Sequence, residues 1–296
     1  MTPHDARSGG RWTRRQWLKN AAIRGLVRGL LVVADRLPAP LLLATCRALG
    51  RLTPWVAPAL ARRARHRAAL ALPAEVAERA TTSCFVNAGT SLAATLLLRR
   101  PQVRPSDWIE IDAAARRELE QAGGAVVVSA HLGPFELVAP AVAEAGLAPA
   151  VVVRESYDPG LDAHVDRHRL ARGVTVIHRG SAGAGTRIVR SLRRGKLVGL
   201  LPDLPARVES VPVAFLGQTV AMPSGPARVA RAARVPLLIC TLAPLPGSDR
   251  FRLHVRRIDP ACGSLQTMTQ RVASTLSEAI SAAPEWWLWM AAPSPG

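Results

Sequence analysis

His131 and Glu136 are the residues of this chain whose types and spacing point most directly to chemistry. Between them stand Gly133 and Pro134, which interrupt the chain after a short apolar run at residues 125–128. A carboxylate bonded to one imidazole nitrogen makes the other nitrogen a better general base, and such a pair can deprotonate a hydroxyl group. We therefore expect the two side chains to meet across this turn.

The spacing is weak support by itself, because His254 and Asp259 share it. That second pair lies in an alternating stretch, where the two side chains would face opposite sides of a sheet, and we interpret it as structural. The alternative interpretation is that His131 is a buried histidine whose hydrogen bonds are satisfied inside the protein and which has only a structural role. The setting favours catalysis, because His131 would stand at the carboxyl end of a parallel strand, where open α/β sheets bind ligands.

The elements that position these residues follow from apolar runs that alternate with helical segments from residue 125 onward. This alternation is typical of a mostly parallel sheet with helices on both faces, so the predicted fold class is α/β, with a mixed central sheet flanked by helices. Strands are predicted at residues 125–129, 150–153, 174–177, 197–201, 236–242 and 251–258, with a short one at 108–112. Helices are predicted at residues 41–52, 54–70, 74–98, 113–122, 134–145 and 186–194.

Two further polar residues follow predicted strands. Arg154 comes directly after residues 150–153 and Asp203 comes shortly after residues 197–201, so both are predicted to share the rim of the sheet with His131. The rigid fork of a guanidinium can hold two oxygens of a phosphate. Asp203 is predicted to orient a cation or to cap a turn.

A basic amphipathic helix is predicted over residues 12–33, and it includes Trp12 and Trp17. Its longest uncharged apolar run, residues 29–34, is far shorter than the roughly 20 residues that a spanning helix needs, so we expect it to lie in a membrane interface. A core-packing helix with a basic outer face is the alternative. We divide the chain into this membrane-associating segment, residues 1–33, and one main domain, residues 34–296.

Composition points to anionic partners. The 296 residues include 39 Lys and Arg against 21 Asp and Glu, for a formal net charge of +18. An anionic membrane surface or a phosphorylated substrate fits this charge. Nucleic acid is not expected, because aromatic residues make up 4% of the chain and do not alternate with arginine on the predicted strands. No metal or cofactor is expected, since there is no His-Glu-x-x-His run and no zinc spacing of cysteines, and since His164 and His168, four residues apart, fit a solvated helix face better than a surface cluster.

Several blocks of the sequence together resemble the bacterial lipid A biosynthesis acyltransferase family, over roughly residues 20–290. The central block, Ser129-Ala-His131-Leu-Gly133-Pro-Phe-Glu136, is similar to the family's His-x4-Glu motif after a hydrophobic strand. Further blocks in the family's order are Val153-Arg154, Asp158-Pro159, Arg169 with Gly173, Gly199-Leu-Leu-Pro-Asp203, Pro212-Val-Ala-Phe215-Leu-Gly217, Met222-Pro-Ser-Gly225-Pro-Ala and Pro284-Glu-Trp286-Trp-Leu-Trp289.

The resemblance implies an acyltransferase that takes a fatty acyl chain from acyl carrier protein, or from acyl-CoA, to a hydroxyl of a membrane glycolipid such as a lipid A precursor. His131 would be the general base and Glu136 would hold its imidazole. Arg154, Arg169 and Asp203 match positions that we assign to substrate binding and site architecture. No cofactor or metal is implied. The implied location is the cytoplasmic side of the inner membrane, with peripheral or shallow attachment.

The chain also departs from the family pattern, because Pro134 and Phe135 stand where Asn-Trp is common. The acceptor therefore stays open between a lipid A precursor and another polar lipid, such as a phosphatidylinositol mannoside. A thioesterase that uses the same site and a membrane lipid-binding protein without catalysis are the alternative functions.

Overall fold

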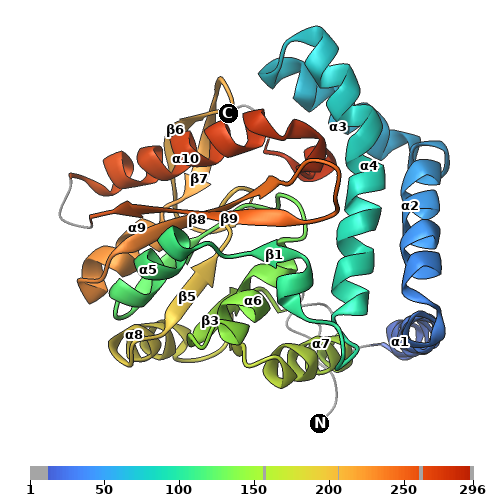
Figure 1. Cartoon of the computed structure of the whole chain (residues 1–296), viewed down its shortest axis with the longest axis horizontal. Coiled ribbons are helices and arrows are strands. Elements are labelled where there is room, and N and C mark those ends of the chain that lie inside the picture. Colours follow the sequence, from blue (N-terminus) through green and yellow to red (C-terminus); the bar gives the residue numbers. More distant parts are fainter. Residues whose placement is uncertain (1–12, 156–157, 206, 260–262, 294–296) are drawn as a thin grey trace.

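The computed structural model describes residues 13–155, 158–205, 207–259 and 263–293. Within these residues the chain forms a mixed seven-stranded sheet in the order β1-β9-β8-β2-β5-β3-β4 (Figure 1). Only β8 and β9 pair antiparallel in this sheet, among the described residues. The strands are β1 Ile109–Glu110, β2 Ala125–Val128, β3 Pro149–Val153, β4 Thr175–His178, β5 Leu197–Leu200, β8 Leu237–Pro244 and β9 Phe251–Ile258.

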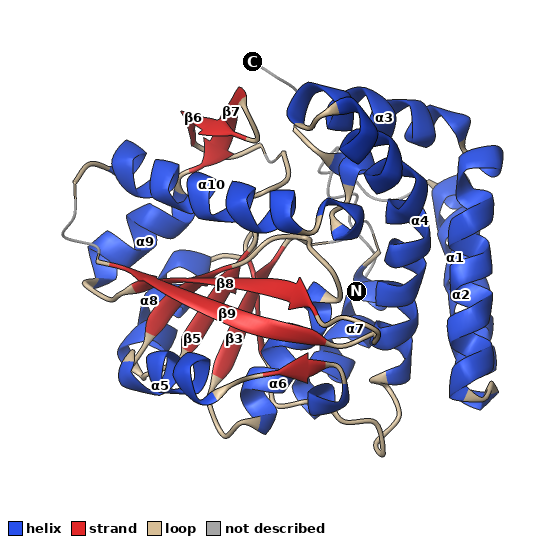
Figure 2. Cartoon of the chain, turned by 45° about the horizontal axis from the view of Figure 1, so that its top comes forward, coloured by secondary structure: helices blue, strands red, loops and turns tan. Residues whose placement is uncertain are grey.

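The central strand β2 is apolar throughout because both of its faces are covered. Val126 and Val128 pack into one hydrophobic core with residues of α8 (Ala184–Arg193), α9 (Gly225–Ala233) and α10 (Leu265–Ala282). Ala125 points to a second core, which α5 (Ala113–Gln121) and α6 (Val138–Glu144) cover from the other face (Figure 2). Side chains that alternate between two buried faces give the continuous apolar run of a central parallel strand. The predicted α/β fold class is confirmed.

Four helices precede the sheet and stand together on the right of Figure 1: α1 (Arg14–Arg36), α2 (Ala39–Val56), α3 (Pro58–Ala71) and α4 (Ala74–Leu97). The backbones of α2 and α4 approach closely at two glycines. A Cβ on Gly50 would lie 2.2 Å from the carbonyl oxygen of Phe85, and one on Gly89 would lie 2.2 Å from that of Cys46. Only glycine allows this approach, because any side chain would overlap the facing carbonyl.

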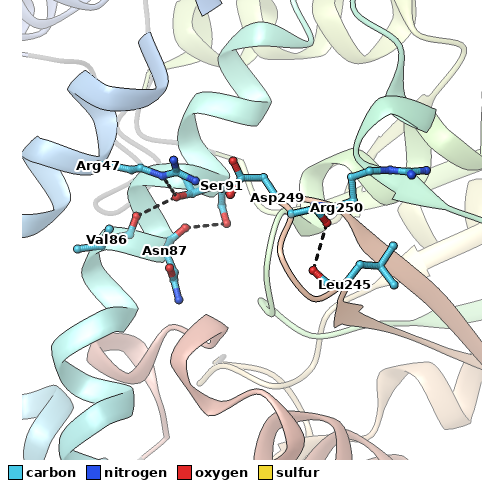
Figure 3. A network of polar contacts seen from close by, with 9 residues as sticks. Arg47, Val86, Asn87, Ser91, Leu245, Asp249 and Arg250 are labelled. Carbon is cyan, nitrogen blue, oxygen red and sulfur yellow. Dashed lines mark hydrogen bonds and ion pairs between the residues drawn. The ribbon is translucent and has the colours of Figure 1, made fainter. Parts of the chain in front are cut away.

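Polar contacts attach these helices to the sheet domain (Figure 3). Arg47 of α2 donates to the Thr90 hydroxyl of α4 at 3.0 Å and forms an ion pair with Asp249 in the turn between β8 and β9. Asn87 of α4 donates to the backbone oxygen of Glu285 at 2.8 Å. Arg47 therefore links α4 to the turn between β8 and β9, and Asn87 bonds α4 directly to the C-terminal segment that carries the tryptophans.

Some predicted boundaries were wrong. The helix α2 continues through Pro54 to Val56, and the helix predicted at residues 134–145 begins as a 3-10 turn, Phe135–Leu137, before α6. The hairpin of β6 (Ser210–Phe215) and β7 (Gln218–Pro223), which packs against α10, was not predicted. None of the described helices combines the length and the apolar character that a membrane crossing requires.

Candidate active site

His131 and Asp203 meet at the carboxyl ends of two neighbouring parallel strands, β2 and β5. The imidazole Nδ1 lies 2.8 Å from Oδ1 of Asp203, and the backbone N–H of His131 donates to Oδ2 at 2.8 Å. The Asp203 side chain is 0% exposed, whereas that of His131 is 23% exposed. The sheet thus brings a buried carboxylate against an imidazole that still reaches the surface.

The C-terminal segment completes the bonding of this carboxylate. The indole Nε1 of Trp287 donates to Oδ2 of Asp203 at 2.9 Å. The backbone of Trp287 also forms an isolated bridge with Leu132, and the N–H of Gly133 donates to the carbonyl of Trp286 at 3.0 Å. Burying a carboxylate is costly unless donors surround it, and here three donors do so.

Gly133 makes the turn after His131 possible. Its φ is +60°, and a Cβ at this position would lie 2.8 Å from the ring of Phe251. Any side chain would therefore be strained both in its backbone and against a buried ring. The chain can reverse here and still leave the His131 side chain at the strand end.

The bonding fixes which nitrogen of His131 can act. Because Nδ1 faces a carboxylate, it carries the proton and donates, which leaves the lone pair on Nε2. Nε2 has no partner among the described residues, and His131 lines a cavity of about 710 Å³. The ring of Phe135 packs edge-on against the imidazole at 4.6 Å between centroids. The imidazole is therefore held from two sides with its basic nitrogen available.

The prediction that the side chains of His131 and Glu136 are in contact was wrong. Glu136 instead accepts from Nη2 of Arg169, with its two oxygens at 2.9 and 3.0 Å. The physical reason is the conformation of the segment after Pro134. Residues Phe135–Leu137 form a 3-10 turn, and the ring of Phe135, not the Glu136 carboxylate, lies beside the imidazole. Asp203, and not Glu136, is therefore the carboxylate bonded to the imidazole. This contact differs from the two roles predicted for Asp203, which were to orient a cation or to cap a turn.

The cavity beside His131 has a volume of about 710 Å³. Its walls are largely apolar, and the strand ends and α9 supply much of this surface, with Val151, Val152, Leu200 and Val229 among the lining residues. Arg154 lines it as predicted, is exposed, and has no acidic partner among the described residues. Arg169 also lines it but is already paired with Glu136. The cavity thus combines an apolar interior with an unneutralised guanidinium.

Histidines of α7 (Pro159–Ala171) stand among cations close to this wall. His164 Nε2 lies 2.8 Å from a guanidinium nitrogen of Arg99, and His168 Nε2 is buried without a partner. Burial, and then the neighbouring charges led by Arg99, lower the pKa of His168 to about 4. No group of three or more His, Cys, Asp or Glu side chains able to hold a metal occurs within the described ranges.

Two contributors to the site were not foreseen from the sequence. Trp287 belongs to the closing tryptophan block, but its indole bond to Asp203 could not be inferred from that block. Arg179 lies just beyond β4 and lines the cavity. Its signal was available, because it follows a predicted strand in the same way as Arg154.

An imidazole bonded to a buried carboxylate, beside an apolar cavity with a free guanidinium, is typical of an enzyme that activates a hydroxyl group or water next to a bound apolar chain. A comparison with protein families matches residues 13–292 to the family described as bacterial lipid A biosynthesis acyltransferase. The chain belongs to this family and is an acyltransferase. A comparison with curated proteins found no match.

Proposed function

We propose that this protein transfers a fatty acyl chain from a carrier thioester to a hydroxyl group of a membrane glycolipid, most directly a lipid A precursor, with His131 as the general base. The observation that carries the proposal is the bond between His131 Nδ1 and the buried Asp203, which leaves Nε2 at the cavity. Acyl carrier protein is the proposed donor and acyl-CoA is the alternative donor.

In the proposed reaction Nε2 of His131 takes the proton of the acceptor hydroxyl as its oxygen attacks the thioester carbonyl. The carbon–sulfur bond then breaks, and the imidazolium returns the proton to the leaving thiolate. Asp203 keeps the imidazole in the reactive tautomer and stabilises its positive charge during the step. Atoms and charge balance without a covalent intermediate on the protein.

The cavity lining supports the substrate assignment. Apolar walls fit an acyl chain, because burial of each methylene contributes about 0.8 kcal/mol. Arg154 and Arg179 line the same cavity and form no ion pair within the described residues, so they are suited to a phosphate of the glycolipid. We assign Arg169 and Glu136 to the wall, where their mutual bond directs the guanidinium towards Glu136.

We propose attachment on the cytoplasmic side of the inner membrane, and the helices α1 and α2 support attachment to an anionic membrane surface. Their exposed side chains include Trp17 at 50%, Leu26 at 65% and Trp55 at 83% exposure. Exposed cations stand among them on α1, with Arg14, Arg15 and Lys19 at its start. Apolar anchors beside cations are typical of a helix that lies in a membrane interface. Residues 1–33 are the proposed membrane-associating segment, although Trp12 lies outside the described residues.

The proposed function is tested by incubating the protein with a labelled acyl thioester and a total lipid extract. We expect the label in a lipid, and a rate at least about a hundredfold lower for His131→Ala, given the usual weight of general base catalysis. Label in free fatty acid would identify a thioesterase, and retention of all label in the donor would identify a binding protein. Either result, or an unchanged rate for His131→Ala, would overturn the proposal.

Membrane attachment is tested separately by flotation with anionic vesicles. A Trp17→Ser/Leu26→Ser double variant should leave the vesicle fraction, because it removes two exposed apolar anchors of α1. Unchanged thermal unfolding serves as the control for folding. Full retention on the vesicles would contradict the role of α1.

A further inference from the structure

The cavity beside His131 extends between two different surroundings. At one end its wall is formed by α7, with Val165 and Arg169 among the lining residues. The cap residue of that helix, Asp158, forms an ion pair with Arg24 of α1 at 3.0 Å. This end of the cavity therefore adjoins the helix that we assign to the membrane surface.

The other end of the cavity is formed by α8 and α9, through residues that include Ile188 and Val229. These two helices are in contact with each other, and both lie on the left of Figures 1 and 2, while α1 and α2 lie on the right. The cavity wall thus also includes helices that lie apart from the proposed membrane surface.

The outer surface of α8 and α9 is strongly basic and carries no acidic residue of either helix. Six exposed arginines make up this surface, which we call the α8–α9 arginine face: Arg187, Arg190, Arg193, Arg194, Arg231 and Arg234. None of them forms an ion pair within the part of the chain that the structure describes, and Arg187 bonds only to neutral oxygens. The neighbouring Arg228, by contrast, is paired with Glu209. Six unneutralised charges next to a cavity indicate an anionic partner.

The chemistry of this face distinguishes a protein partner from a membrane. The exposed large hydrophobic residues of the described chain gather mainly on the N-terminal helices, and α8 and α9 contribute none of them. A membrane-binding helix would combine cations with apolar anchors. A single phosphate group would need a convergent cluster, whereas these arginines are spread along two helices. Their arrangement fits the extended acidic surface of a protein.

We propose that the α8–α9 arginine face is the docking surface for an acidic carrier protein, which delivers its acyl thioester into the cavity from this end. The inference rests on the proposed acyltransferase function and deepens it, because it assigns the donor and the lipid acceptor to opposite ends of one cavity. The acceptor reaches His131 past α7 and α1, and the donor arm reaches it past Ile188 and Val229.

The test compares two charge-reversal variants that change the net charge equally. The first is Arg190→Glu/Arg193→Glu/Arg194→Glu on α8. The matched control is Arg62→Glu/Arg63→Glu/Arg65→Glu on α3, whose three arginines are also exposed but lie on a helix that packs against α4. A milder Arg190→Gln/Arg194→Gln variant covers the case in which the first variant fails to fold.

Steady-state kinetics are measured with acyl-acyl-carrier-protein and with acyl-N-acetylcysteamine, which has the same thioester without a protein. For the α8 variants we expect KM for the carrier-protein donor to rise at least about tenfold, the scale on which complementary charge alters association. KM for acyl-N-acetylcysteamine should be unchanged, and the α3 control should match the wild-type protein with both donors.

Direct binding separates failure of this inference from failure of the proposed function. Fluorescently labelled carrier protein is titrated with each variant, with no turnover required. Weaker binding by the α8 variants alone supports the docking surface even if no acyl transfer is detected. Equal binding by wild type and α8 variants, equal weakening by the α3 control, or loss of the α8 variants from anionic vesicles would overturn it.

Discussion

Glu136 lines the cavity and Asp203 follows Pro202 of its lining, and the surroundings of these two carboxylates differ. Asp203 is 0% exposed and accepts from the His131 imidazole, the His131 backbone and the Trp287 indole. Glu136 is 37% exposed and is bonded by Arg169 alone among the described residues. A buried carboxylate with several donors has one fixed position, whereas a half-exposed ion pair is screened by water and can adjust. Asp203 is therefore the carboxylate that holds the imidazole of His131, and Glu136 is part of the cavity wall.

The largest effect is expected for Asp203→Asn. The amide has nearly the same shape but cannot stabilise the imidazolium, and its NH2 group can force the imidazole into the other tautomer. The rate of acyl transfer should fall by about 10² to 10⁴, the range of general acid–base catalysis. Single-turnover acyl transfer measures this rate. A rate within about threefold of wild type would remove Asp203 from the account.

A smaller effect is expected for Glu136→Gln. Glu136 acts through Arg169, so its loss should free the guanidinium and lower kcat/KM by about tenfold through poorer positioning. Arg169→Met should have a similar effect, and the double variant should be no worse than either single variant, because the two residues form one contact. Additive losses would show that Glu136 and Arg169 act independently.

The smallest effect is expected for His168, which contributes to the pH dependence of the free energy of unfolding. Burial, and then the charge of Arg99, lower the pKa of His168 in the folded protein from the ordinary histidine value of 6.5 to about 4. The unfolded chain therefore binds more protons between these two values, and stability should fall as pH drops from about 6.5 towards about 4. His168→Gln should reduce this dependence, measured by chemical denaturation at several pH values. An unchanged dependence would show that His168 is not responsible.

Much of this fold was predictable from local patterns. The apolar runs that became β2, β3 and β5 are buried or partly buried along their length, and such strands are recognisable because no polar residue interrupts them. The hairpin of β6 and β7 was missed even though Val213, Phe215, Val220 and Met222 are buried in alternation. Its turn residues, Leu216 and Gly217, both have positive φ, and leucine gives no warning of this conformation.

The candidate site was predictable only in part. The placement of His131, Arg154 and Asp203 at strand ends follows from the sequence, but the order of the strands does not. Because β5 is inserted between β2 and β3, Asp203 reaches His131 from 72 residues away. A carboxylate five residues away is the obvious partner until that order is known. The order of the strands in the sheet therefore determines which carboxylate bonds to the imidazole of His131.

The most direct measurement of this assignment is nitrogen NMR of the His131 imidazole, with the signal identified by its absence in His131→Ala. We predict a proton on Nδ1 and a free Nε2 in the wild-type protein, the same state in Glu136→Gln, and loss of that state in Asp203→Asn. A tautomer that survives Asp203→Asn but changes in Glu136→Gln would contradict the account.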